Sequence, residues 1–243
     1  MRIQRRSLIL AMSMLVLVQW MAETPTPASA QTEERAVPIL KAPFHVPVFT
    51  NEYIILLNIN VPPGRNTGYH THSSDSVSVN VEAADMTNQI FGSTEVTGPP
   101  PGDRGRATFT NYTKEGPRTH KASNVGPTPF HNLSFIFRRP GPEGLTPSSR
   151  AGVSGYTQVM DNERVRGWRV VLEPGQSTGQ ITQQAPGLRI VLDGGVLAEI
   201  VPGQSDRGMS PRSGDFSWQD PGTTRTVRNT GTTRIEFVEF ELK

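Results

Sequence analysis

The feature that most constrains the fold of this chain is an internal repeat. The segment from Glu173 to Gln183 aligns without a gap with the earlier segment from Pro62 to His72, at an offset of 111 in the numbering. The alignment continues into alternating apolar residues, which are Val77, Val79 and Val81 in the first copy and Leu188, Ile190 and Leu192 in the second. Self-similarity at a fixed period indicates that one structural unit has been duplicated.

The two copies differ at the residues that can carry chemistry. A second pair of segments begins at His120 and at Arg225, now at an offset of 105, so the first copy holds six extra residues. The Pro- and Gly-rich stretch 97–106 is their expected position. Three histidines of the first copy are replaced in the second: His70 by Ile181, His72 by Gln183 and His120 by Arg225. We therefore expect one working site in the first copy and a structural role for the second.

Residues 1–30 have the layout of a secretory signal peptide. Arg2, Arg5 and Arg6 precede an apolar run from Leu8 to Trp20, and small residues follow as far as Ala30. The run is shorter than the roughly 20 residues of a membrane span, which favours cleavage after Ala30 over an anchor. The paired arginines partly resemble a twin-arginine signal, so that route and the general secretory route both stay open. The prediction is a periplasmic or secreted protein with no membrane insertion after cleavage.

Charge and cysteine content exclude several kinds of partner and crosslink. The chain has 24 Lys and Arg and 22 Asp and Glu residues; three arginines and one glutamate lie in residues 1–30, which leaves 21 of each. A neutral mature chain gives no electrostatic reason to expect nucleic acid as a partner. The sequence contains no cysteine, so disulfide bonds cannot stabilise the fold.

Strand signals dominate the mature sequence. Twenty-one prolines and 23 glycines separate short runs, and apolar and polar residues alternate within several of them, as in residues 76–82 and 133–138. This period of two is typical of half-buried strands in an all-β protein. We expect an N-terminal arm over residues 31–44, a first domain over 45–138, a linker over 139–155 and a second domain over 156–243.

Two motifs resemble those of a known family. Gly64 is followed after five residues by His70 and His72, and His120 is followed by Asn124 and then Gly126. This order and spacing resemble the two-block signature of the cupins, and together with the duplication residues 45–243 resemble a bicupin. The resemblance implies two tandem jelly-roll β-barrels, the first binding a metal and the second degenerate.

The histidines also suit a metal site on physical grounds. Residues i and i+2 of a strand point to the same face, so His70 and His72 project together. Imidazole nitrogens coordinate divalent metals at about 2.0–2.1 Å. His120, from a distant strand, is the candidate third ligand.

The chain departs from the cupin pattern at the fourth ligand. The family's usual glutamate falls at Ser76, and Asp75 is either an alternative fourth ligand or a group that supports the ligands. The site is then similar to that of three-histidine cupins, several of which are non-haem iron dioxygenases. This implies one divalent transition metal, with iron favoured and manganese, nickel, copper or zinc also compatible with three imidazoles.

Three further residues are weaker candidates for substrate contact. Tyr69 and Arg65 flank the histidine pair and could instead cap the barrel rim. His131 is more simply explained as a structural histidine, and His45 has no expected role.

Two functions are compatible with these residues, and fold alone cannot separate them. The first is an exported metal-dependent enzyme of the oxygenase type that acts on a small organic substrate able to chelate the metal. The alternative is a non-catalytic periplasmic protein that binds or senses a small molecule or the metal. A single barrel of about 90 residues leaves part of a sheet uncovered, so we expect the second barrel, or the second chain of a homodimer, to cover it.

Overall fold

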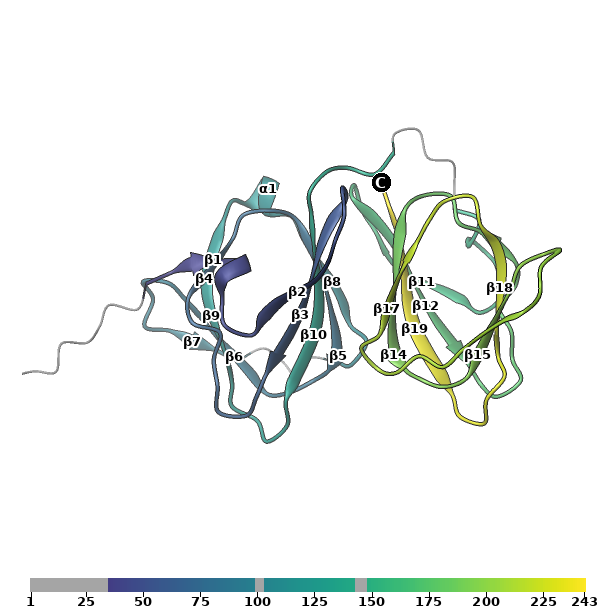
Figure 1. Ribbon diagram of the computed structural model, residues 1–243. Helices are drawn as coiled ribbons and strands as arrows, with labels where there is room; N and C mark the ends of the chain where they lie inside the picture. Colours follow the sequence, from purple (N-terminus) through teal and green to yellow (C-terminus); the bar gives the residue numbers. More distant parts are fainter. Residues whose placement is uncertain (1–34, 99–102, 143–147) are drawn as a thin grey trace, which may run out of the picture. The chain divides into compact units, whose positions relative to one another are not determined.

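The computed structural model describes residues 35–98, 103–142 and 148–243, and most of these lie in β-sheets (Figure 1). The predicted signal peptide, residues 99–102 of the predicted insertion and residues 143–147 of the predicted linker lie outside the described residues. Among the described residues, no helix is long and apolar enough to cross a membrane.

The first copy of the repeat forms two five-stranded sheets in the described residues, with strand orders β1-β4-β9-β6-β7 and β2-β3-β10-β5-β8. The pair β1 and β4 is parallel and the other pairs in these sheets are antiparallel. The elements are β1 Val37–Pro38, the 3-10 helix η1 Ile39–Lys41, β2 His45–Thr50, β3 Ile54–Val61, β4 His70–His72, β5 Ser76–Glu82, β6 Met86–Ile90, β7 Val96–Thr97, β8 Ala107–Thr110, α1 Tyr112–Glu115, β9 Arg118–Asn124 and β10 Phe130–Phe137.

The second copy repeats this arrangement with sheets of strand order β11-β12-β19-β14-β17 and β13-β18-β15-β16. The predicted all-β fold of two tandem jelly rolls is confirmed. The strands are β11 Tyr156–Asp161, β12 Val165–Leu172, β13 Ile181–Thr182, β14 Gly187–Asp193, β15 Leu197–Ile200, β16 Arg207–Met209, β17 Phe216–Gln219, β18 Thr224–Asn229 and β19 Ile235–Leu242.

The alternating apolar residues of both copies meet in one core cluster. Val77 and Phe135 of the first copy belong to the same cluster as Ile190 and Phe240 of the second. The rings of Phe135 and Phe240 pack edge to face, with centroids 5.2 Å apart. The apolar faces of β5 and β10 therefore pack toward the second copy, and the opposite, polar faces of these strands point into the first barrel.

Strand register locates the extra residues of the first copy. Equivalent pairs in the two copies are Ser76–Thr110 with Gly187–Gln219 and His70–His120 with Ile181–Arg225. The offset between copies is thus 109 at Thr110 and 105 at His120. Four of the six extra residues therefore lie between β8 and β9, where α1 is found, and the prediction that placed them in residues 97–106 was wrong for these four.

The equivalence of the copies extends into the predicted arm and linker. Pro38 in the arm pairs with Thr71 on the edge of β4. At the equivalent place in the second copy, the Oγ of Ser149 donates to the carbonyl oxygen of Thr182 at 2.6 Å and accepts from its N–H at 3.0 Å. Both segments thus lie beside the strand that carries the histidine pair or its replacement, the first through strand pairing and the second through the Ser149 side chain.

Candidate metal centre

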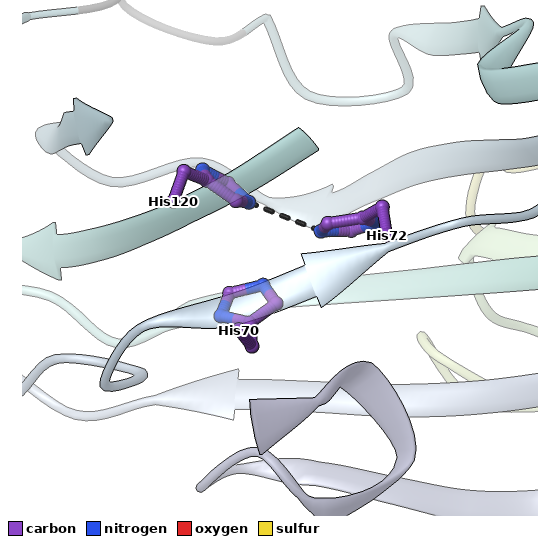
Figure 2. Close-up of side chains that lie close together, drawn as sticks. All are labelled: His70, His72 and His120. Carbon is purple, nitrogen blue, oxygen red and sulfur yellow. Dashed lines mark hydrogen bonds between the residues drawn. The ribbon is translucent and has the colours of Figure 1, made fainter. Parts of the chain in front are cut away.

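Two adjacent strands bring together the three histidines of the sequence motifs (Figure 2). β4 carries His70 and His72, β9 carries His120, and His70 lies opposite His120 in the strand register. One ring nitrogen of each histidine lies within 4.8 Å of the others. The first barrel therefore holds a cluster able to bind a metal.

The ring nitrogens fit a single divalent ion. Two nitrogens that each lie about 2.1 Å from one ion, at right angles, are about 3.0 Å apart. The Nε2 atoms of His72 and His120 are 3.0 Å apart. The Nδ1 of His120 lies 3.0 Å from the Asn88 Oδ1, and the Nδ1 of His70 lies 3.1 Å from the Gly68 carbonyl oxygen. Because these oxygens only accept, each Nδ1 carries the proton and each Nε2 keeps a lone pair for a metal.

Burial keeps all three imidazoles in the neutral form that metals require. Burial, with smaller contributions from His120 and His45, lowers the pKa of His70 to about 3. Burial and the other histidines lower the pKa of His72 to about 2, and burial followed by Arg118 lowers the pKa of His120 to about 4. A metal ion therefore meets little competition from protons near neutral pH.

The structure adds His45, to which the sequence motifs assigned no role. Its ring centroid lies 4.6 Å from that of His70, and it lines the same cavity. It belongs to β2 in the opposite sheet and lies outside the group of three convergent nitrogens. His45 belongs to no sequence motif. At the offset of 111 it aligns with Tyr156, and this alignment was the available sign that the position belongs to the repeated unit.

Asp75 contacts α1 instead of the histidines. Its Oδ1 accepts a hydrogen bond of 2.8 Å from the Thr113 N–H, and its Oδ2 lies 3.6 Å from the Nε of Arg164. Thr113 follows Tyr112 in α1, and the ring of Tyr112 stacks on that of His72 with centroids 5.1 Å apart. Asp75 thus positions the inserted helix that presents Tyr112 to the metal centre.

The three weaker candidates lie away from the cavity. Tyr69 is buried and packs edge to face against Phe91, with ring centroids 5.1 Å apart. Arg65 is exposed, and the Nε2 of His131 lies 2.9 Å from the Oδ1 of Asn58. None of the three is among the residues that line the cavity beside the histidines, so the structure brings none of them to the metal centre.

A cavity of about 290 Å³ opens beside the histidines. Asn88 and Tyr112 line it together with residues from the polar faces of the strands that pack on the second barrel. These wall residues are Ser76, Ser78 and Asn80 of β5 and Asn132 and Ser134 of β10.

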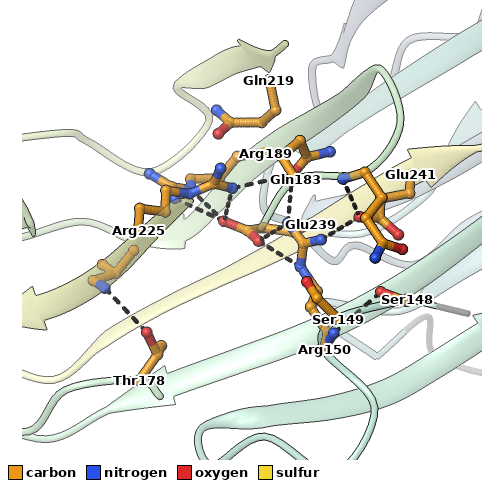
Figure 3. A network of polar contacts seen from close by, with 12 residues as sticks. Ser148, Ser149, Arg150, Thr178, Gln183, Arg189, Gln219, Arg225, Glu239 and Glu241 are labelled. Carbon is orange, nitrogen blue, oxygen red and sulfur yellow. Dashed lines mark hydrogen bonds and ion pairs between the residues drawn. The ribbon is translucent and has the colours of Figure 1, made fainter. Parts of the chain in front are cut away.

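Ion pairs line the corresponding interior of the second barrel (Figure 3), where Arg189, Glu199 and Arg225 border a cavity of about 400 Å³. Arg225, at the position of His120, lies 3.3 Å from carboxylate oxygens of both Glu199 and Glu239. Arg150 and Arg189 each approach Glu239 to 2.7 Å. Glu199 and Glu239 reach Arg225 from the other strands β15 and β19, and no sequence motif pointed to them.

Comparison with known proteins gives structural matches only. No protein-family model and no curated protein sequence matches the chain. Salicylate 1,2-dioxygenase from Pseudaminobacter salicylatoxidans matches with a TM-score of 0.53 and 13% identity, covering 78% of this chain and 71% of that one. The same enzyme with gentisate adducts gives a TM-score of 0.52 at 13% identity, covering 80% and 70%. AerE from Microcystis aeruginosa gives 0.50 at 9% identity, covering 83% and 98%. These likenesses show the fold of this chain, which is that of a bicupin.

Proposed function

We propose that this protein is an exported, metal-dependent enzyme of the oxygenase type that acts on a small organic molecule. The observation that carries the proposal is the cluster of three neutral histidines beside a cavity of about 290 Å³. His70, His72 and His120 would hold a divalent ion, and three neutral ligands would leave its charge available to a chelating substrate. Bound iron would supply the redox chemistry with dioxygen.

The residues of the chain orient and enclose this centre. Asn88 and the Gly68 carbonyl group fix the tautomers of His120 and His70, so that both Nε2 lone pairs face the same space. Tyr112 covers His72 from the inserted helix and reduces the access of water to that side. The polar residues of β5 and β10 provide hydrogen-bonding groups for a substrate.

The fold comparison supports the reaction class, and it does so by analogy alone. The solved structures of similar fold include a salicylate 1,2-dioxygenase, and one of these structures carries gentisate. This likeness supports oxygenation of a small molecule. Because one fold hosts many activities, the identity of the substrate depends on the residues that line the cavity.

Oxygen consumption tests the proposed activity. Residues 31–243 would be loaded with Fe(II) without oxygen, and uptake would be followed with an oxygen electrode as candidate organic acids are added. We expect substrate-dependent uptake that His120→Ala abolishes and that His131→Ala retains, because His131 lies outside the cavity. Tight binding of a small molecule without uptake in the iron, manganese, nickel or copper form would instead identify a binding or sensing protein.

The export proposal rests on the layout of residues 1–30 and has its own test. Full-length protein expressed in a Gram-negative host should be recovered from the periplasm or medium with Gln31 as its first residue. Intact-mass measurement gives the cleavage position. Recovery from the cytoplasm with residues 1–30 still attached would contradict the proposal and leave the metal centre unaffected.

A further inference from the structure

The metal cavity has one polar wall, while elsewhere its lining includes the apolar side chains of Ile59, Met86 and Phe130. Its inward-facing residues on β5 and β10 are small hydroxyl and amide side chains, while the apolar residues of the same strands pack against the second barrel. The Ser78 hydroxyl donates to the Asn132 Oδ1 at 2.9 Å, and the Asn132 Nδ2 donates to the Asn80 Oδ1 at 2.9 Å. These two bonds hold the amides in place without using the Asn80 amide nitrogen.

The second barrel shows that the fold does not require this wall. Ser78 and Ser134 correspond, in the strand register, to Arg189 and Glu239. In the second barrel these two residues pair with each other at 2.7 Å, so their polar groups are satisfied within the protein. In the first barrel the Asn80 amide nitrogen is instead left at the cavity, where a ligand can accept its hydrogen bond.

One cationic side chain accompanies this wall. Arg106 directly precedes β8 and is exposed, and it lines the cavity together with Thr108 and Thr110. Its backbone is anchored to the wall, because its carbonyl oxygen accepts a hydrogen bond of 3.1 Å from the Asn80 N–H. The residues that line the cavity include no aspartate or glutamate, so nothing there opposes an anion.

We propose that the substrate is a small hydroxylated aliphatic carboxylate, with its carboxylate on Arg106 and its hydroxyl groups on the wall of β5 and β10. The inference rests on the proposed function, because it places the substrate in the cavity of the metal centre. A guanidinium group binds a carboxylate through two parallel hydrogen bonds. A molecule without hydroxyl groups would leave the Asn80 amide nitrogen without a partner in the cavity, and such sites discriminate against it.

Calorimetric titration of the nickel-loaded protein tests the substrate class without requiring turnover. The probes are gluconate and malate as hydroxylated acids, gentisate as an aromatic acid and hexanoate as an apolar acid. We expect gluconate or malate to bind most tightly. Arg106→Gln should weaken that binding about tenfold or more, because it removes a charge-assisted pair. Arg65→Gln is the matched control and should leave binding unchanged, since Arg65 is exposed outside the cavity.

Ser134→Val provides a second, uncharged variant. It should weaken gluconate or malate binding and spare nickel occupancy, because Ser134 lies on the wall and outside the histidine cluster. The inference is overturned if gentisate or hexanoate binds most tightly, if no probe binds, or if Arg106→Gln has no effect. Gentisate-dependent oxygen uptake would overturn it while supporting the oxygenase proposal. Tight gluconate or malate binding without oxygen uptake would support it and count against the oxygenase proposal.

Discussion

The two barrels of this protein share a strand arrangement and differ in what fills it. Inside the first barrel, neutral histidines, small polar side chains and apolar side chains such as Ile59, Met86 and Phe130 surround a cavity of about 290 Å³. Inside the second, arginines and glutamates stand at equivalent positions and pair with one another beside a cavity of about 400 Å³. The backbone frame is therefore compatible with either interior, and the side chains decide which chemical groups border each cavity.

The charges of the second barrel compensate one another. Burial by itself raises the pKa of Glu239, but Arg189, Arg150 and Arg225 outweigh it and hold that pKa well below its usual range. Glu239 is therefore ionised while fully buried, which the surrounding guanidinium groups make tolerable. In the first barrel, convergent lone pairs have no such partner within the protein. A duplicated barrel can thus become structural by satisfying its own polar groups.

The largest expected effect is the loss of metal from the first barrel. Elemental analysis of the purified protein should give about one transition metal per chain, all of it held by the first barrel. His120→Ala should remove most of it, because only two of the three nitrogens are left to converge. His131→Ala should retain the metal. Two tightly held metals per chain would contradict the contrast between the barrels.

A large loss of stability is expected from breaking the ion network of the second barrel. Glu239→Gln leaves Arg150, Arg189 and Arg225 without their shared carboxylate and should lower the free energy of unfolding by about 3–5 kcal/mol. Urea unfolding followed by circular dichroism gives this value. Ser134→Ala at the equivalent position of the first barrel should cost about 1 kcal/mol or less. Similar losses from both changes would remove the distinction between the two interiors.

Between about pH 6.5 and 5, before unfolded carboxylates such as Glu239 titrate, the pH dependence of stability should come from the first barrel. Above pH 6.5 its histidines are neutral in the folded and unfolded states. As the pH falls from 6.5 toward about 5, the unfolded chain takes up protons that the buried histidines resist, so the free energy of unfolding of the metal-free protein should fall. Each histidine contributes at most about 1.4 kcal/mol per pH unit. A variant with alanine at positions 70, 72 and 120 should show a shallower slope in urea titrations, and an unchanged slope would contradict this assignment.

The smallest effect is expected at Asp75. Asp75→Ala removes the acceptor for the Thr113 N–H and the partner of Arg164, which should lower stability by about 1–2 kcal/mol. Metal content should be unchanged, because Asp75 contacts none of the histidines. Thermal unfolding and elemental analysis of the same sample separate the two readouts. Loss of the metal with normal stability would instead make Asp75 a ligand.

The sequence by itself determined the repeat, the β architecture and the convergence of three histidines. These follow from local rules. The strand period of two places His70 and His72 on one face, and the resemblance to the second block of the cupin signature pointed to His120. The sequence also predicted that the second copy lacks the histidine cluster, because the residues that replace the histidines lie in aligned segments.

Tertiary structure alone decided which strand face points inward and which distant groups meet. Alternation in β5 marks an apolar face and a polar face, but only contact with the second barrel assigns the apolar one to the interface and the polar one to the cavity. Asp75 lies three residues from His72 and still contacts α1, while Glu239 reaches Arg225 from another strand. Such contacts depend on the packing of elements far apart in the chain, and the periodicity of the sequence does not predict that packing.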